Sequence, residues 1–494
     1  MYTIGYDIGS SSIKAALVNS LTGESIAVVT QPKKEMEMTA VKNGWAEQDP
    51  DLWWDHVCTA TRLLLSDNQV DPEMVTGIGI SYQMHGLVIV DTKGKPIRDS
   101  IIWCDSRAVD IGQHAFDSLG NERCAEHLLN SPGNFTASKL KWVKENEPDN
   151  YNRIYKFMLP GDYIAFKFSG LINTTVSGLS EGIFWDFKNN GIADWLMNHY
   201  GLEAQHLPDI KDTFSEQGRV SEQGAKASGL AKGTPVLYRA GDQPNNALSL
   251  NVFQPGEVAA TGGTSGVVYA ITDNLSVAES SRVNNFAHVN YTTSIPRIGK
   301  LLCINGAGIQ YRWLLNNLKV DSYEHMNDLA ESIPIGSDGV TILPFGNGAE
   351  RMLNNKELGT RISHLNLNNH TKAHLCRAAL EGIAFSFVYG MEIMKADGIE
   401  ARVIRAGNDN LFRAAIFSNT IATLLGQEIE IYNTTGAIGA ARACQLHHGN
   451  FKAFGNQIMD NDYIMGYTPS AGKASYEDAY TTWKKELERI LNYE

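Results

Sequence analysis

Two segments with the same pattern, about half a chain apart, constrain the fold more than any other feature. They are YTIGYDIGSSSIKAALVN at residues 2–19 and GEVAATGGTSGVVYAIT at residues 256–272. Each alternates apolar with other residues, passes through a turn of glycines and hydroxyl residues, and alternates again. This pattern predicts a strand, a tight turn and a second strand. Two such units indicate a duplicated α/β architecture, with one domain beginning at each unit and a central cleft between them.

The rest of the chain supplies further strands and helices to both domains. At 494 residues the chain is too long for one hydrophobic core, and we place the domains at residues 1–248 and 249–494. A buried strand is expected within residues 76–84, and a hairpin-like pair within residues 86–97 with its turn at Lys93-Gly94. Apolar spacing and start and stop signals predict helices at residues 51–67, 137–147, 309–318, 372–396, 411–426 and 476–494.

The composition is that of an ordinary globular protein and excludes some functions. Hydrophobic residues make up 43% and charged residues 20%, and the formal net charge is −13. Nucleic acids and anionic membranes bind basic surfaces, so this charge argues against both as general partners, although a local basic pocket for a phosphorylated ligand stays compatible with it. The chain shows no apolar leader pattern and no membrane-length apolar run, so we expect a cytoplasmic enzyme or binding protein.

The six cysteines are dispersed, and no pair has the spacing of a metal or redox motif. We therefore expect buried, reduced thiols rather than a disulfide framework or a zinc site. They are Cys58, Cys104, Cys124, Cys303, Cys376 and Cys444.

The two glycine turns have the chemistry of phosphate-binding loops. Glycines let the backbone approach a ligand closely, and successive N–H groups and hydroxyls can cradle phosphate oxygens. Asp7, at the first turn, offers the oxygen ligands that Mg²⁺ prefers, directly or through water. Taken singly, each turn is more often a plain hairpin, but two copies that open two α/β halves favour nucleotide binding. The candidate residues are Ser10, Ser11, Lys14, Gly262, Gly263 and Thr264.

A single acid, Asp242, lies in the segment YRAGDQPNNALSL at residues 238–250, just ahead of the second turn. An aspartate after glycine and shortly before proline is typical of a plain turn, in which Pro244 makes Gln243 extended. The alternative is a carboxylate placed to remove a proton. Neither a GxxxxGK[ST] loop nor a GxGxxG after the first strand occurs. What remains is the duplicated fold of actin-like ATPases and sugar kinases.

Over essentially its full length the chain resembles the FGGY family of carbohydrate kinases. The segment GNFTASKLKWVKEN at residues 133–146 is close to the first family signature, with Thr136 and Lys139 among the matching positions. HLCRAALEG at residues 374–382 keeps the C-terminal half of the second signature, and Gly241-Asp242-Gln243 matches the segment that supplies the family's catalytic aspartate. The resemblance implies an α/β fold of two duplicated ribonuclease H-like domains, of the actin-like ATPase type, around a central cleft.

Within that family, three segments are similar to D-xylulose kinases: YQMHG at residues 82–86, NGWAEQDPDLWW at residues 43–54 and WCDSR at residues 103–107, in which Cys104 replaces the usual asparagine. Singly, His85 is also compatible with a satisfied histidine at a strand end, Trp103 with a core residue, and Asp105 with an ion pair to Arg107. The sugar-binding residues that the resemblance implies are Gln83, Met84, His85, Trp103, Asp105 and Asp242.

The resemblance also implies residues for ATP. Besides the second glycine turn, it points to Gly306 and Gln310 in NGAGIQ at residues 305–310, and to Gly407 and Asn410 in IRAGNDN at residues 404–410. Glu350-Arg351 is retained from a further family loop, without an assigned role. ATP and Mg²⁺ are the expected cofactors, with Asp7 at the metal.

These features predict an ATP-dependent kinase that transfers the γ-phosphoryl group to the 5-hydroxyl of D-xylulose, with Asp242 as the general base. One alternative is a kinase of the same family for ribulose, fuculose, gluconate, glycerol or erythritol. Met84-His85 argues against glycerol, because glycerol kinases have Arg-Glu at these positions. Another is a sugar- and ATP-binding protein without catalysis, or an actin-like ATPase for protein partners. We expect sugar and ATP as partners, neither nucleic acid nor membrane, and a homodimer.

Overall fold

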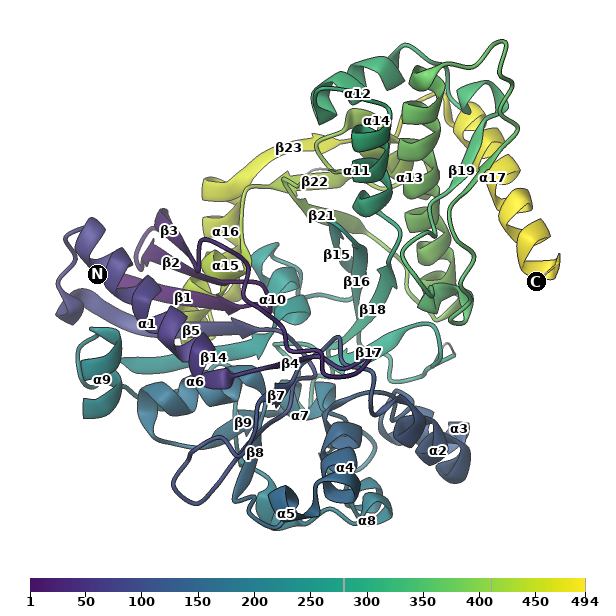
Figure 1. Ribbon diagram of the computed structural model, residues 1–494. Helices are drawn as coiled ribbons and strands as arrows, with labels where there is room; N and C mark the ends of the chain where they lie inside the picture. Colours follow the sequence, from purple (N-terminus) through teal and green to yellow (C-terminus); the bar gives the residue numbers. More distant parts are fainter. Residues whose placement is uncertain (279, 410, 494) are drawn as a thin grey trace.

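The computed structural model describes residues 1–278, 280–409 and 411–493, and its two main sheets lie in separate lobes (Figure 1). The six-stranded sheet has the order β13-β14-β5-β1-β2-β3, and the seven-stranded sheet has the order β17-β18-β16-β15-β21-β22-β23. The strands of the first sheet are β1 (Tyr2–Ile8), β2 (Ile13–Asn19), β3 (Ser25–Gln31), β5 (Val75–Tyr82), β13 (Gly218–Arg219) and β14 (Pro235–Gly241). Those of the second are β15 (Glu257–Gly262), β16 (Gly266–Thr272), β17 (Asn284–Ala287), β18 (Ile298–Ile304), β21 (Val403–Gly407), β22 (Ile429–Tyr432) and β23 (Tyr463–Tyr467).

Five strands of each sheet repeat one arrangement. In the first sheet β1, β2 and β3 pair antiparallel, and β5 and then β14 continue parallel to β1. In the second sheet β15, β16 and β18 pair antiparallel, and β21 and then β22 continue parallel to β15. The predicted duplication is confirmed, and the two β-turn-β segments open the two copies.

The predicted helices form, with shifted ends. Asp49 caps the first of them by accepting from the N–H of Asp51, and Pro50 occupies its first turn, where a missing N–H costs nothing. The helix predicted from residue 411 begins only at Ala415, and ahead of it the side-chain carboxylate of Asp409 accepts from the N–H of Gly262. The helices that match predictions are α1 (Pro50–Asp67), α4 (Thr136–Asn146), α11 (Gly308–Asn317), α13 (Lys372–Ala396), α14 (Ala415–Leu425) and α17 (Lys473–Tyr493).

One local expectation is wrong. The segment Gly241–Pro244 is not a turn: β14 runs directly into helix α10 (Asp242–Ser249), and Gln243 is helical rather than extended. Pro244 lies in the first helical turn, where its lack of an N–H removes no hydrogen bond. The hairpin-like pair with its turn at Lys93-Gly94 forms: Val90 bridges Pro96, and the N–H of Ile97 donates to the carbonyl of Ile89. On its other side β6 (Val88–Val90) pairs with β8 (Lys156–Met158).

The remaining elements are short helices and two-stranded sheets outside the two main sheets. Helices α2 to α5 and α8 form the lower part of Figure 1, beside the end of the first sheet. The helices are α2 (Val109–Leu119), α3 (Asn121–His127), α5 (Pro148–Tyr151), α6 (Pro160–Ser169), α7 (Val176–Glu181), α8 (Asp194–Tyr200), α9 (Glu222–Ser228) and α12 (Tyr323–Glu331). The short strand pairs are β4 (Glu47–Gln48) with β7 (Ser100–Ile101), β9 (Asn173–Thr175) with β12 (Asp209–Lys211), β10 (Trp185–Asp186) with β11 (Gly191–Ile192), and β19 (Thr341–Leu343) with β20 (Arg361–Ser363).

Helix α15 (Gly436–Ala443) follows β22 of the second sheet but packs on the first sheet (Figure 1). Helix α16 (Phe451–Asp462) comes next and reaches the turn between β2 and β3, where Gln457 and Asn461 donate to the carbonyls of Leu21 and Thr22. The close approach depends on glycines, since a Cβ at Gly5 or Gly79 would overlap backbone of α15. At the far end of α15, the buried guanidinium of Arg442 donates to the carbonyl of Gly23 and forms an ion pair with Asp462 of α16. The assignment of residues 249–494 to a second domain stays a prediction, because α15, which belongs to that range, packs on the first sheet.

All six cysteines are free, and Cys104 is the exposed one among them. In the part of the chain that the structure describes, none of the helices is long and apolar enough to cross a membrane.

The seam between α15 and the first sheet leads to a stability prediction. In Gly79→Ala the new methyl group has to displace the carbonyl of Ala440, so we expect a loss of about 1–3 kcal/mol in the free energy of unfolding. Denaturant unfolding measures this. Gly472→Ala is the matched control, because a Cβ there meets open space; equal stability of the two variants would contradict the prediction.

Candidate active site

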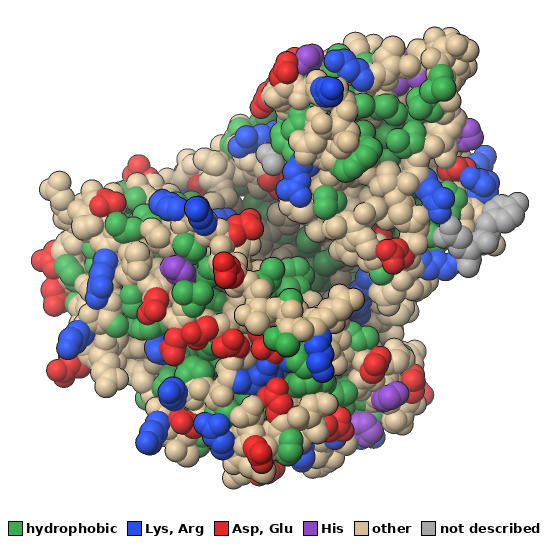
Figure 2. Space-filling view, viewed as in Figure 1, with side chains coloured by type: hydrophobic (Ala, Val, Ile, Leu, Met, Phe, Trp, Pro, Cys, Tyr) green, Lys and Arg blue, Asp and Glu red, His purple; other side chains and the backbone are tan. Residues whose placement is uncertain are grey.

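Asp7 and Asp242 lie at one edge of the first sheet. Parallel strands end at the same edge, and the register pairs Asp7 of β1 with Ser81 of β5, and Ser81 with Ala240 of β14. The hydroxyl of Ser81 donates to Asp7 Oδ1 at 3.1 Å. Asp242 follows at the first position of α10, so both acids stand at the carboxyl ends of the strands, where open α/β sheets bind ligands. Figure 2 shows the surface hollowed between the two lobes.

The two carboxylates affect each other's titration. Burial and then the charge of Asp7 raise the pKa of Asp242 to about 7. Burial also raises the pKa of Asp7, while the charge of Lys14 and the hydrogen bond from Ser81 act against it. Two acids that resist ionising together fit a hard divalent cation, which neutralises both. Among the described residues no three His, Cys, Asp or Glu side chains could share a metal, so a Mg²⁺ ion at Asp7 would need water or nucleotide oxygens as further ligands.

The first glycine turn is tight and open on its outer side. The N–H of Gly9 donates to the carbonyl of Ser12 at 3.1 Å, and the side chains of Ser11 and Lys14 are exposed. Ser10 accepts from Trp103 Nε1 at 3.3 Å. The predicted first phosphate turn and the predicted sugar loop therefore touch.

The loop after β5 holds His85 in a left-handed conformation, with φ at 62°, which side chains other than glycine rarely adopt. Its ring packs edge-on against Phe135 and tilted against Phe286. Burial and the nearby charges of Lys139 and Arg351 lower the pKa of His85 to about 3, so the imidazole is neutral at physiological pH.

Gln83, in the same loop, is 2% exposed, and neither its amide oxygen nor its amide nitrogen has a hydrogen-bond partner among the described residues. Buried polar groups are rarely left so in proteins. An unsatisfied donor and acceptor beside Met84-His85 fit a polyhydroxylated ligand, which supplies both kinds of partner.

Residues of the first family signature hydrogen-bond the backbone of this loop. The ammonium of Lys139, on α4, is fully buried and donates to the carbonyls of His85 at 2.8 Å and Ile102 at 3.0 Å. Thr136 donates to the carbonyl of Gly86. Burial lowers the pKa of Lys139 to about 8. These signature residues therefore hold the backbone of the loop in position.

The WCDSR segment divides into an exposed part and a buried part. Trp103 is 53% exposed, so it is not a core residue. Asp105 is 0% exposed, and its carboxylate accepts from the N–H of Ala46 and from the guanidinium of Arg107. The ion-pair alternative thus describes Asp105, and the structure does not bring this carboxylate to the surface of the cleft. Arg107 in turn stacks on Trp45.

The second glycine turn is tied to the start of α11. The N–H groups of Gly308 and Ile309 donate to the carbonyls of Gly263 at 3.1 Å and Thr264 at 2.9 Å. The N–H of Gly262 donates to Asp409 Oδ2 at 2.8 Å. Beside the turn lies a small pocket of about 60 Å³, lined by Gly263, Thr264, Gly308, Tyr311, Arg312, Tyr323 and Leu411.

Glu350, which the sequence left without a role, fixes the neighbouring loop. Its fully buried carboxylate accepts from the N–H groups of Asn305 at 2.9 Å and Gly306 at 2.8 Å, and burial raises its pKa to about 7. A Cβ at Gly306 would overlap the carbonyl of Pro344. Gln310 is nearly buried and accepts from Thr360, while its Nε2 has no partner in the described structure.

The later glycine turn is seen only in part. Gly407 ends β21, next to β15 and β22, and a Cβ there would meet open space. Asn410 lies outside the described residues. Their nucleotide-binding roles stay predictions.

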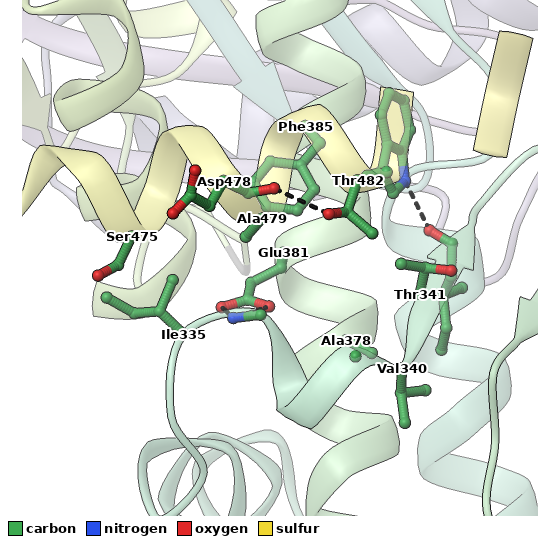
Figure 3. Close-up of a pocket in the computed structure, with 14 residues that line it drawn as sticks. Ile335, Val340, Thr341, Ala378, Glu381, Phe385, Ser475, Asp478, Ala479 and Thr482 are labelled. Carbon is green, nitrogen blue, oxygen red and sulfur yellow. Dashed lines mark hydrogen bonds between the residues drawn. The ribbon is translucent and has the colours of Figure 1, made fainter. Parts of the chain in front are cut away.

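The second family signature is remote from the two acids and fastens a loop. Glu381 of α13 is buried, forms an ion pair with Arg377, and accepts from the N–H of Gly336. A Cβ at Gly382 would overlap the carbonyl of Ile342. Figure 3 shows Glu381 in a pocket of about 360 Å³ between α13, α17 and the segment 335–342. The signature residues of α13 hold that segment.

Three features near the site carry no signal that the sequence analysis used. Asp409 anchors the second glycine turn through Gly262. Gly436, at the start of α15, lies so close that a Cβ would stand 2.9 Å from Asp7 Oδ2, and Asn245 donates to its carbonyl at 2.9 Å. Glu181, at the end of α7, accepts from the N–H of His85. These two acids and one glycine become neighbours of the candidate site only because the fold brings distant segments of the chain together.

Two models of one protein family match this chain. The family model for the N-terminal domain of the FGGY family of carbohydrate kinases matches residues 2–249, and that for the C-terminal domain matches residues 258–446. The chain belongs to the FGGY family of carbohydrate kinases. The predicted family, kinase class and two-domain actin-like fold are thereby confirmed.

The relatives of this FGGY kinase include several xylulose kinases. That of Staphylococcus xylosus is 28% identical over 499 residues, which cover 98% of this chain and 99% of the relative. That of Escherichia coli strain K12 is 25% identical over 494 residues, which cover 99% of each. Among solved structures, xylulose kinase from Rhodospirillum rubrum has a TM-score of 0.89 at 22% identity, covering 100% of this chain and 99% of that one, and supports the fold.

The contact between α15 and Asp7 leads to a second prediction. Gly436→Ala places a methyl group 2.9 Å from Asp7 Oδ2 and has to move that carboxylate. Misplacement of a reacting group by about 1 Å costs roughly 10²-fold in rate, so we expect sugar-dependent ATP consumption to fall by that order. A coupled ADP assay measures it, with Gly472→Ala as the control. Activity within about twofold of the parent chain would contradict a role for Gly436 in placing Asp7.

Proposed function

We propose that this FGGY kinase transfers the γ-phosphoryl group of Mg·ATP to the 5-hydroxyl of D-xylulose, giving D-xylulose 5-phosphate and ADP. The observation that carries the proposal is the pair of acids, Asp7 and Asp242, at one sheet edge beside a loop with an unsatisfied Gln83. The xylulose kinases among the relatives support the choice of sugar.

Asp242 is the proposed general base. As the acceptor oxygen forms its bond to the γ-phosphorus, the bond from that phosphorus to the bridging oxygen of ADP breaks, and the hydroxyl proton passes to the Asp242 carboxylate. A pKa of about 7 leaves the carboxylate available near neutral pH and basic enough to take a proton. Such help is typically worth about 10²–10⁴-fold.

Asp7 is proposed to hold Mg²⁺, which balances charge on the phosphates when bound. We propose that Lys14, which is exposed and in register with Asp7, and the hydroxyls of Ser10 and Ser11 contact phosphate oxygens at the first turn. We place the other phosphates at the second turn and the rest of the nucleotide toward the pocket beside it. The proposed residues there are Gly262, Gly263, Thr264, Gly306, Gln310 and Gly407.

The acceptor is proposed to lie against Gln83, Met84, His85 and Trp103. In the neutral His85, Nδ1–H donates to the carbonyl of Glu181 at 3.0 Å, so Nε2 is left to accept one hydrogen bond from a sugar hydroxyl. The exposed indole of Trp103 can cover the apolar face of a carbon chain. We propose that Asp105 acts indirectly, through Arg107 and the backbone of residue 46.

An acceptor panel tests the reaction. With D-xylulose, ribulose, fuculose, gluconate, glycerol and erythritol offered at equal concentration, we expect D-xylulose to give the highest kcat/KM in a coupled ADP assay. A higher kcat/KM for another acceptor would contradict D-xylulose as the substrate but would still support the kinase reaction. ATP hydrolysis indifferent to every acceptor would overturn the proposed function.

Asp242→Asn and the pH profile test the base. The variant should lose at least about 10²-fold in kcat while its sugar affinity, measured by calorimetry, stays near that of the parent chain. Because the pKa is raised to about 7 and only the carboxylate accepts a proton, kcat/KM should be full above that pH and fall about tenfold per unit below it. An acid limb near pH 4, or a variant with substantial turnover, would remove Asp242 from this role.

A further inference from the structure

One buried carboxyl beside the site has no part in the proposed reaction. Glu181 is the last residue of α7, a short helix capped at its start by Thr175, and it is 1% exposed. The helix lies against β17 of the second sheet and brings Glu181 beneath the loop that carries His85. No family signature singled out in the sequence contains it.

Glu181 holds His85 by two contacts. Its Oε2 accepts from the N–H of His85 at 2.9 Å, and its main-chain carbonyl lies 3.0 Å from the ring Nδ1. A residue in the left-handed region persists only where its surroundings enforce that conformation. These two contacts, together with the hydrogen bond from Lys139 to the carbonyl of His85, stabilise the left-handed conformation.

The other carboxyl oxygen faces the strand that leads to the base. A Cβ at Gly241 would stand 3.4 Å from Glu181 Oε1 and 2.6 Å from Cγ of Met84. Gly241 immediately precedes Asp242. In the described structure Oε1 has no hydrogen-bond partner, and solvent does not reach it. The carboxyl group of Glu181 thus lies between the start of α10 and the loop that carries Gln83, Met84 and His85, which we call the acceptor loop.

The surroundings favour a neutral carboxyl. Burial raises the pKa of Glu181 well above its usual range, against hydrogen bonds from Tyr82 and the His85 N–H, and the charges of Asp242 and Asp162 raise it further. A glutamine in this position would therefore preserve both the charge state and an acceptor for the N–H of His85.

We propose that Glu181 is a positioning residue, which sets His85 relative to Asp242 and so decides which acceptor hydroxyl reaches the base. This inference rests on the proposed function for its kinetic consequences, while its structural consequence is independent of catalysis. Reacting groups held in a near-attack geometry lose roughly 10²-fold when misplaced by about 1 Å.

The test compares Glu181→Ala and Glu181→Gln with Ser177→Ala. Ser177 lies on the same helix, is also buried, and loses one hydrogen bond, which runs to the carbonyl of Ala287 and not to His85. Glu181→Ala should lower kcat/KM for D-xylulose by roughly 10²-fold and leave KM for ATP unchanged. The ratio of kcat/KM for D-xylulose to kcat/KM for the next-best acceptor should also fall. Glu181→Gln should stay within about threefold of the parent chain, since it keeps the neutral acceptor.

Hydrogen exchange gives a readout that needs no turnover. In Glu181→Ala the amide of His85 loses its acceptor, so the peptide that contains residues 82–90 should exchange faster than in Ser177→Ala or Glu181→Gln. Equal exchange and equal acceptor kinetics in Glu181→Ala and Ser177→Ala would overturn the inference. A parent chain inactive with every acceptor would overturn the proposed function instead, and the exchange comparison would still decide the role of Glu181.

Discussion

The site depends on two like charges held together at low solvent exposure. Asp7 and Asp242 cannot both ionise without cost, and the first sheet forces them together because β1 and β14 flank β5 and end at one edge. The surrounding structure limits that cost: Ser81 donates to Asp7, Lys14 stands opposite it, and α10 begins at Asp242, where the helix N-terminus favours negative charge. Burial and the remaining repulsion raise the pKa of Asp242 to about 7, and the proposed roles of Asp242 as base and of Asp7 as metal ligand rest on this difference between the two acids.

The residues by which the family is recognised in this chain mostly position other groups. Lys139 and Thr136 hold the carbonyls of the acceptor loop, and Glu381 fastens a loop remote from both acids. Glu350 does the same for the backbone at Asn305 and Gly306. Buried charges with several hydrogen bonds are costly to replace, since removal of one partner leaves the others unsatisfied. The proposed site of two acids and two glycine turns is therefore held in place by a larger framework of buried polar residues.

Much of the fold could be predicted because its signals are local. Alternating apolar residues around a glycine turn specify β1-β2 and β15-β16, and Asp49-Pro50 marks the start of α1. The prediction failed at Pro244, which is as compatible with the first turn of a helix as with a turn, and only the packing of α10 against α15 decides between them. Asp105 matched a sugar-loop pattern, yet Arg107 and the backbone of Ala46 engage its carboxylate. Glu181 and Gly436 join the site from distant parts of the chain, which no spacing rule reveals.

The crossing of α15 back onto the first sheet bears on how the protein is made. On the ribosome, β1, β2, β5 and β14 emerge well before α15, and N-terminal domains generally begin to fold first. Until α15 has been synthesised, the face of the sheet at Gly5 and Gly79 lacks its covering helix, and Asp7 lacks its neighbour Gly436. The second lobe is largely translated by then. The catalytic edge is therefore completed among the last steps of folding, so a chain that stalls midway cannot assemble the pair of acids in its final setting.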